Sequence, residues 1–123
     1  MVVNMRHQHH TIDYVEFYVD DLATAKAFYR EAFGWQFNDY GDAYSGIQAP
    51  ERDGELGGIT VGETRARSPL VLMISEDLDA SLESVRAAGG EVVEGPYDYP
   101  GGRRFHFSDP SGNVLGVFQP SDG

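Results

Sequence analysis

The sequence predicts an α+β protein with two tandem βαβββ modules, whose curved mixed sheets pair around a cavity. Three observations predict this fold class: a segment that repeats 56 positions later, a strand-helix-strand pattern in each copy, and two more apolar strands after each copy. At 123 residues the chain has the length of a single domain. Two modules of half that size must therefore share one core.

The repeated segment is Tyr14–Phe37, which aligns with Leu70–Val93 without a gap. About one or two identities would be expected by chance in a segment of this length. Six pairs are identical: Val15/Val71, Asp21/Asp77, Leu22/Leu78, Arg30/Arg86, Ala32/Ala88 and Gly34/Gly90. The two copies therefore describe one supersecondary unit that is used twice.

Each copy begins with a strand, Tyr14–Val19 or Leu70–Ser75, rich in apolar and β-branched residues. Acidic residues come next in both copies, where a helix N-terminus favours negative charge. An apolar stripe of helical period then follows, and glycines mark the helix ends. The next predicted strands are Gln36–Tyr40 and Glu91–Glu94.

A hairpin completes each module. Its predicted strands are Ala43–Gln48 and Leu56–Gly62 in the first module, and Arg103–Ser108 and Val114–Gln119 in the second. Asp109-Pro110-Ser111-Gly112 has the residues that a type I turn favours. Gly95–Gly102 reads as a loop, either a mobile lid or a plain connection.

The predicted domain organisation is a flexible leader at residues 1–10 followed by one domain at 11–123. Within it, module 1 covers about 11–62, a polar linker 63–69, and module 2 about 70–119. The leader carries His7, His9 and His10, which could chelate a metal as a flexible tract or belong to an unstructured end.

Alternation along the strands assigns the two sheet faces. Val15, Phe17 and Val19 should pack on the first helix, and Phe105 and Phe107 on the second. The intervening residues should then line the cavity. The predicted ligand-binding residues are Tyr14, Glu16, Tyr18, Leu70, Leu72, Arg104, His106 and Phe118.

Each candidate also has a structural interpretation. His106 is either a hydrogen-bonding residue or a catalytic base, and Glu16 is the second catalytic candidate. Glu16 and Arg104 form an ion pair or orient a polar ligand. The tyrosines of the cavity face could serve packing or dimer contacts instead of ligand recognition.

Composition excludes several classes of protein. The net charge of −11 argues against nucleic-acid binding, which needs a basic patch. The acidity is explained either by solubility or a salty habitat, or by attraction of a cationic ligand. No apolar run reaches the roughly 18 residues of a membrane span. The sequence has no cysteine, which excludes disulfides and thiolate sites and fits a cytoplasmic location.

The doubled unit resembles the glyoxalase/bleomycin-resistance/extradiol-dioxygenase group, the vicinal oxygen chelate superfamily, over about residues 12–119. The most specific pieces are Phe28-Tyr29 followed by Phe33-Gly34-Trp35, and Asp109-Pro110-x-Gly112-Asn113. The resemblance implies paired modules around a cavity, very often in a homodimer. It does not fix an activity, because this fold hosts metalloenzymes and metal-free binding proteins.

The resemblance also implies where a metal would bind. Family members that use a divalent cation hold it with His, Gln or Glu side chains of the first and last strands of each module. Here those positions fall on Tyr14, Leu70, Gly116 and the stretch Leu56–Val61. Leucine and glycine offer no donor atom, so we expect no metal and no cofactor.

Three functions remain open. The leading expectation is metal-independent binding of a small molecule in the cavity. The first alternative is a lyase, isomerase or dioxygenase that has an unusual metal site or uses Glu16 and His106 as an acid-base pair. The second is a dimeric interaction protein with a vestigial cavity. The sequence does not identify the ligand.

Overall fold

The computed structural model describes residues 8–50, 52–62 and 68–121. These residues form two compact units. The first unit is Tyr14–Leu70, and the second combines the residues before Tyr14 with those after Leu70. Most of the predicted linker 63–69 and the leader up to His7 lie outside the described residues.

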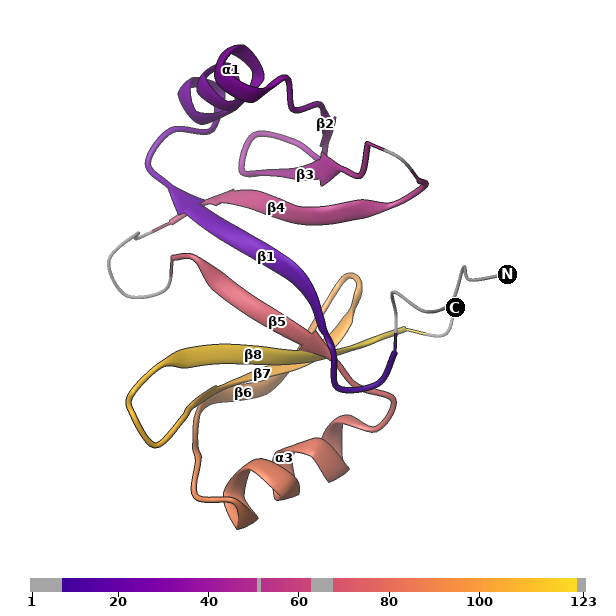
Figure 1. Ribbon diagram of the computed structural model, residues 1–123, viewed down its shortest axis with the longest axis vertical. Coiled ribbons are helices and arrows are strands. Elements are labelled where there is room, and N and C mark those ends of the chain that lie inside the picture. The colour runs from indigo at the N-terminus through magenta and orange to yellow at the C-terminus, as the bar shows by residue number, and fades with distance from the viewer. Residues whose placement is uncertain (1–7, 51, 63–67, 122–123) are drawn as a thin grey trace. The chain divides into compact units, whose positions relative to one another are not determined.

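The first unit follows the predicted βαβββ order (Figure 1). Its strands lie in the order β2-β3-β4-β1, with β1 parallel to β4 and antiparallel pairs elsewhere. The elements are β1 (Ile12–Val19), α1 (Leu22–Phe33), β2 (Phe37–Asp39), β3 (Tyr44–Gln48) and β4 (Glu55–Val61).

The second unit repeats this plan. Its strands lie in the order β5-β8-β7-β6, with β5 parallel to β8 and antiparallel pairs elsewhere. The elements are β5 (Leu70–Ile74), α3 (Leu78–Ala87), β6 (Glu91–Tyr99), β7 (Gly102–Ser108) and β8 (Val114–Pro120). The α+β fold class and the doubled βαβββ plan are thus confirmed.

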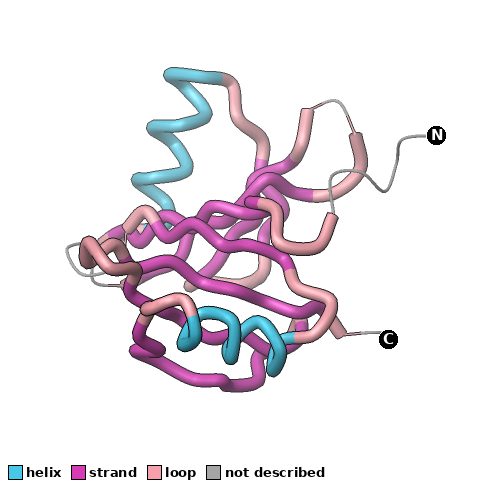
Figure 2. The backbone as a smooth tube through the Cα atoms, turned by 60° about the horizontal axis from the view of Figure 1, so that its bottom comes forward, coloured by secondary structure: helices cyan, strands magenta, loops and turns pink. Residues whose placement is uncertain are grey.

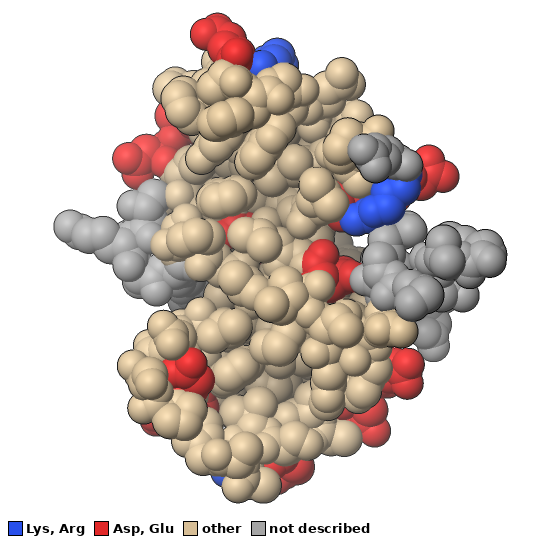
Figure 3. Space-filling model, viewed as in Figure 1, with Lys and Arg blue, Asp and Glu red and all other residues tan. Residues whose placement is uncertain are grey.

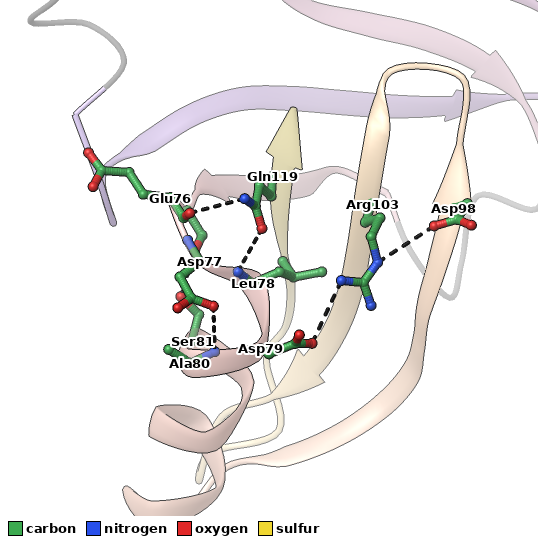
Figure 4. A network of polar contacts seen from close by, with 10 residues as sticks. Glu76, Asp77, Leu78, Asp79, Ala80, Ser81, Asp98, Arg103 and Gln119 are labelled. Atoms are coloured by element: carbon green, nitrogen blue, oxygen red, sulfur yellow. Dashed lines mark hydrogen bonds and ion pairs between the residues drawn. The ribbon is translucent and has the colours of Figure 1, made fainter. Parts of the chain in front are cut away.

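The aspartates of the sequence repeat are helix caps. Asp21 accepts a hydrogen bond from the Thr24 backbone N–H at the start of α1, and Asp77 accepts one from Ala80 at the start of α3 (Figure 4). Each carboxylate satisfies a backbone donor that has no partner within the helix. The repeated Asp-Leu pair therefore fixes where both helices begin.

Each helix packs on one face of the sheet in its own unit. Beneath α1, Leu22 packs with Ile47 and Ile59, and Phe17 and Val19 join them. Beneath α3, the buried cluster consists of Leu78, Leu82, Phe105 and Val117, with Phe107 packed against it. Figure 2 shows α3, the lower cyan helix, in front of the strands of its unit.

Polar side chains hold α3 on its sheet (Figure 4). The side-chain amide of Gln119 accepts from the Leu78 backbone N–H at 2.8 Å and donates to the Glu76 carbonyl at 3.0 Å. Arg103 of β7 pairs with Asp79 of α3 at 3.7 Å and with Asp98 of β6 at 3.5 Å. Arg103 therefore belongs to the helix-facing side of β7.

The prediction of a loop at Gly95–Gly102 is wrong. Strand β6 continues to Tyr99, and the chain reverses only at the following two residues. Tyr97 pairs with Arg104, and Tyr99 pairs with Gly102. The Gly95-Pro96 dipeptide, which favours turns in sequence, lies where the register shifts between Glu94 and Tyr97. Gly95 has a φ of 85°, so the strand accommodates the dipeptide as an irregularity and continues.

The residues just before β1 belong to the second unit and contact its other elements. The His10 backbone N–H donates to the Ile74 carbonyl at 2.6 Å, and His10 Nε2 lies 2.7 Å from Ser81 Oγ. His9 Nδ1 accepts a hydrogen bond from the Glu76 backbone N–H. In the sequence these histidines belong to a polar tract without periodicity, so their contacts could not be predicted from it.

Negative charge is spread over the surface. On the face shown in Figure 3, acidic side chains are scattered over both units, whereas basic side chains are few. This distribution agrees with the net charge of −11. No helix among the described residues is long and apolar enough to cross a membrane.

Candidate functional site

The sheet face opposite α3, here called the α3-distal face, carries two rows of paired residues. Because Phe105 and Val117 pack beneath α3, the residues that alternate with them point the other way. The first row is Glu94, His106, Gly116 and Leu72, and the second is Tyr97, Arg104, Phe118 and Ile74. Four predicted site residues, Leu72, Arg104, His106 and Phe118, thus share one face.

His106 lies at the centre of a polar cluster, although only 1% of its surface is exposed. Its Nδ1 lies 3.2 Å from Glu94 Oε1. Its Nε2 lies 3.3 Å from the Tyr97 hydroxyl and accepts a hydrogen bond from Arg104 Nε, also at 3.3 Å. Both ring nitrogens therefore have polar neighbours, as a buried histidine requires.

The arrangement indicates one tautomer of His106. Arginine Nε can only donate a hydrogen bond, so Nε2 of His106 must carry the lone pair. The ring proton of neutral His106 then lies on Nδ1 and is donated to Glu94. The histidine presents a proton acceptor at Nε2 and is oriented by a carboxylate at Nδ1.

Arg104 is held by aromatic rings as well as by His106. Its guanidinium carbon lies 5.8 Å from the ring centre of Tyr97 and 5.5 Å from that of Tyr99. Such cation–π contacts are stronger where water is excluded, and Arg104 is only 8% exposed. Two tyrosines of the segment predicted as a loop therefore position the guanidinium.

Gly116 provides the space for this cluster. A Cβ atom at Gly116 would lie 2.5 Å from Leu72 Cδ2 and 3.2 Å from His106 Cδ2. Both distances are too short for an ordinary contact, so any larger residue would displace Leu72 or the imidazole. The position that the family resemblance assigned to a metal ligand is occupied by neighbouring side chains.

The first unit has its own polar network on the sheet face opposite α1. The hydroxyls of Tyr14 and Tyr44 lie 2.6 Å apart. Tyr44 donates to Glu16 at 3.3 Å, and Tyr14 to Glu55 at 3.4 Å. Glu16 is 6% exposed, so this network satisfies buried polar groups.

Glu55 is the hub of this network. Its Oε2 accepts hydrogen bonds from Asn38 Nδ2 at 2.9 Å and from the Tyr40 hydroxyl at 2.5 Å. Its carboxylate lies over Gly46, where a Cβ atom would approach within 2.2 Å. The Tyr44 hydroxyl lies over Gly58 in the same way, at 1.9 Å from a hypothetical Cβ. Glycines in β3 and β4 therefore make room for the network.

Burial and charge keep the two bonded tyrosines protonated. Desolvation is the main cause that raises the pKa of Tyr14. The pKa of Tyr44 is raised first by desolvation and next by the nearby Glu16 carboxylate. A phenolate at either position would be buried beside a carboxylate, which is unfavourable.

The remaining predicted site residues are Tyr18 and Leu70. Tyr18 follows Glu16 on β1 and packs beside Gly62, where a Cβ would lie 2.8 Å from its ring. Leu70 is fully buried.

The predicted site residues do not include Glu55 and Glu94. Glu55 stands in a turn-rich stretch, and Glu94 stands before a glycine-proline pair, so periodicity gives neither residue a face. A shift of 56 positions aligns Glu94 with Asn38, and this shared position was the sequence signal that could have indicated the face of Glu94. Asn38 and Glu94 each begin a row of residues paired across neighbouring strands. The row from Asn38 continues with Gly46, Gly58 and Glu16. The row from Glu94 continues with His106, Gly116 and Leu72.

The residues at the inherited metal positions do not fit a metal ion. Leu70 and Gly116 have no donor atom, and the Tyr14 hydroxyl is hydrogen-bonded and held in its neutral form. In β4, the Thr60 hydroxyl donates to the Ala43 carbonyl. Among the described residues, no group of three His, Cys, Asp or Glu side chains could hold a metal ion.

Solved structures of other proteins share the fold of this chain. The doubled βαβββ fold is shared with the Mn(II)-bound glyoxalase from Novosphingobium aromaticivorans, at a TM-score of 0.68 and 25% identity over 91% of this chain and 39% of that one. It is also shared with methylmalonyl-CoA epimerase from Mycobacterium tuberculosis, at a TM-score of 0.68 and 18% identity over 95% of both chains.

The sequence profile of the Glyoxalase/Bleomycin resistance protein/Dioxygenase superfamily matches residues 11–117, and the chain belongs to this superfamily. The anthracycline biosynthesis protein DauV of Streptomyces sp. (strain C5) is 34% identical over 115 residues, covering 89% of this chain and 41% of DauV. The chain spans less than half the length of the curated relatives it matches. The predicted family is confirmed.

Proposed function

We propose that this protein binds a small organic molecule without a metal ion, through the α3-distal face of the second unit. The ligand has an apolar body that contacts Leu72 and Phe118, and a polar or anionic end that pairs with Arg104. The observation that carries the proposal is the buried Arg104 guanidinium, which contacts His106 and has its carbon 5.8 and 5.5 Å from the ring centres of Tyr97 and Tyr99.

The chemistry of this face supports such a ligand. Binding sites for small molecules combine mostly apolar walls with a few well-placed polar groups. Phe118 and the buried Leu72 are apolar residues of this face, and Arg104 supplies a permanently charged donor for carboxylate, phosphate or phenolate oxygens. Tyr14, Glu16, Tyr18 and Leu70 remain predicted ligand contacts.

The comparisons support a small-molecule role at a coarser level. DauV, of which this chain covers 41%, is named an anthracycline biosynthesis protein, and that name fits a small-molecule role. An aromatic ligand with an acidic hydroxyl would satisfy both the apolar and the cationic parts of the α3-distal face. Metal independence is supported by the absence of donor atoms at Leu70 and Gly116.

We also propose that the protein is a homodimer. Two aromatic residues of α1 support this, since Phe28 is 57% and Phe33 is 65% exposed. They extend an aromatic cluster that includes Tyr29 and Trp35. Exposed aromatic patches of this kind are common at protein interfaces.

Mass spectrometry of small molecules released from the purified protein tests the binding function. Wild-type protein should release a molecule with an aromatic or aliphatic body and an acidic group, and Arg104→Ala should release much less. Arg103→Ala is the matched control, because Arg103 is the adjacent arginine but pairs with Asp79 and Asp98 on the other side of β7. Equal recovery from both variants would contradict the role of Arg104.

A further inference from the structure

The α3-distal face contains a proton acceptor that ligand binding alone does not require. In this protein Glu94 fixes Nδ1 of His106, and Nε2 carries a lone pair directed towards Arg104 and Tyr97. A carboxylate-oriented imidazole of this kind is suited to general-base chemistry.

We propose that His106, positioned by Glu94, removes a proton from the bound ligand, which is a phenol or enol whose conjugate base pairs with Arg104. The inference rests on the proposed binding function and deepens it by naming the ligand class. In this step the O–H bond of the ligand breaks and the proton forms a bond to Nε2 of His106. The electron pair stays on the ligand oxygen, so no oxidant or cofactor is involved.

Each charge that the step creates has an opposite charge beside it. The oxyanion forms next to the Arg104 guanidinium, which already lies 3.3 Å from Nε2 through its Nε. The imidazolium forms with its Nδ1 proton on Glu94, at 3.2 Å. Buried charges are costly unless they are paired, and this arrangement pairs both.

The contacts at Nε2 leave a better hydrogen bond to be made. Arg104 Nε and the Tyr97 hydroxyl both lie 3.3 Å from Nε2, at the long end of the hydrogen-bond range. The two donors share one lone pair. A ligand hydroxyl that donates to Nε2 at an ordinary distance would make a shorter hydrogen bond than either of these two contacts.

Two charged residues of the same sheet contact the His106 ring and act on it in opposite directions. Glu94 of β6 favours the imidazolium and Arg104 of β7 opposes it, while Tyr97 of β6 contributes its hydroxyl. From β8 and β5, the neighbours of the ring are Gly116 and Leu72, which are uncharged. The protonation state of His106 should therefore respond directly to Glu94 and Arg104.

The first test is nitrogen-15 NMR of the imidazole groups in the ligand-free protein, with His106→Gln used to assign the signal. In wild-type protein, the neutral His106 ring should carry its proton on Nδ1. Glu94→Gln should lower the pKa of His106, because the negative charge that stabilises the imidazolium is removed. Glu91→Gln, which removes an exposed carboxylate from the start of the same strand, should leave that pKa unchanged.

Two results of the NMR test would overturn the inference. One is a ring proton on Nε2 of neutral His106 in the wild-type protein. The other is an unchanged His106 pKa in a folded Glu94→Gln protein.

The second test uses 4-nitrophenol, whose phenol and phenolate forms have different visible spectra. At a pH below the pKa of the free phenol, binding to wild-type protein should raise the phenolate fraction several-fold. His106→Gln should abolish this rise, and Arg103→Ala should retain it. Binding without any rise in phenolate would overturn the inference and leave the binding function standing. No binding of the probe to wild-type protein would overturn both.

Discussion

Four consecutive residues of β7 separate the scaffold from the candidate site. Arg103 and Phe105 face α3, where Arg103 pairs with Asp79 and Phe105 is fully buried in the helix-facing core. Arg104 and His106 face the other way and form the polar cluster. The period of two along a strand places both functions in one short segment.

Phe105→Ala should therefore destabilise the protein without removing any group of the proposed site. Truncation of a buried phenylalanine leaves a cavity and costs about 3–5 kcal/mol. Arg103→Ala removes only partly exposed ion pairs and should cost at most about 1 kcal/mol. Urea unfolding followed by circular dichroism measures both changes. Similar losses in the two variants would contradict the burial of Phe105 in the helix-facing core.

The alternation along β7 was readable from the sequence because each residue type matches its face. Aromatic residues at Phe105 and Phe107 alternate with polar residues at Arg104 and His106, and the helix-facing role of both phenylalanines is confirmed. The carboxylate partner of His106 was not readable in this way. Glu94 lies next to a shift in register, so counting along β6 does not reveal its face.

At the scale of elements, the turn between β7 and β8 is stabilised by one carboxylate. Asp109 accepts hydrogen bonds from the backbone N–H groups of Ser111 and Asn113 and from the Asn113 side chain. The Asn113 side chain is the main cause that holds the pKa of Asp109 below its usual value. This turn contains the Asp-Pro-x-Gly-Asn motif, so the motif has a structural role here.

The lowered pKa predicts a pH dependence of stability. Because the pKa of Asp109 is lower in the folded protein, its contribution is present above the usual aspartate pKa of about 3.9 and is lost as pH falls through the folded value. Asp109→Asn should be less stable than wild type near neutral pH, and the difference should shrink at acid pH. Urea unfolding at several pH values measures this. A difference that stays constant or grows on acidification would contradict it.

Element boundaries were predictable where the local chemistry is repeated. Asp21 and Asp77 cap their helices, and the strands that begin each module lie where the apolar runs predict them. The extent of β6 was not predictable, because glycine and proline usually interrupt strands. In this protein the pairing of Tyr97 and Tyr99 with β7 continues the ladder past Gly95 and Pro96.

At the scale of the whole molecule, the homodimer proposal predicts a mass of about twice the 13.6 kDa of the chain. Sedimentation equilibrium at micromolar concentration measures it. Phe28→Ser and Phe33→Ser replace exposed aromatic residues of α1 and should shift the protein towards monomer if this surface is the interface. A wild-type mass that corresponds to one chain would refute the dimer.

Membership of the superfamily follows from the sequence profile that matches residues 11–117, but an activity has to be argued from the site. The doubled βαβββ plan was predictable because it appears twice in one sequence. The chemistry was only partly predictable, since the networks around Glu55 and Glu94 depend on glycines and strand irregularities that sequence patterns do not specify. The proposed function therefore rests on residues outside the positions where the family resemblance places a metal.

Titration calorimetry of 4-nitrophenolate into protein treated with a chelator tests the central claim most directly. Wild-type protein should bind the anion equally well with and without the chelator. Arg104→Ala should weaken binding by about tenfold or more, as expected for a lost charge-assisted contact of at least 1.4 kcal/mol, whereas Arg103→Ala should not. Binding that requires added metal, or that is equal in the two arginine variants, would contradict the account.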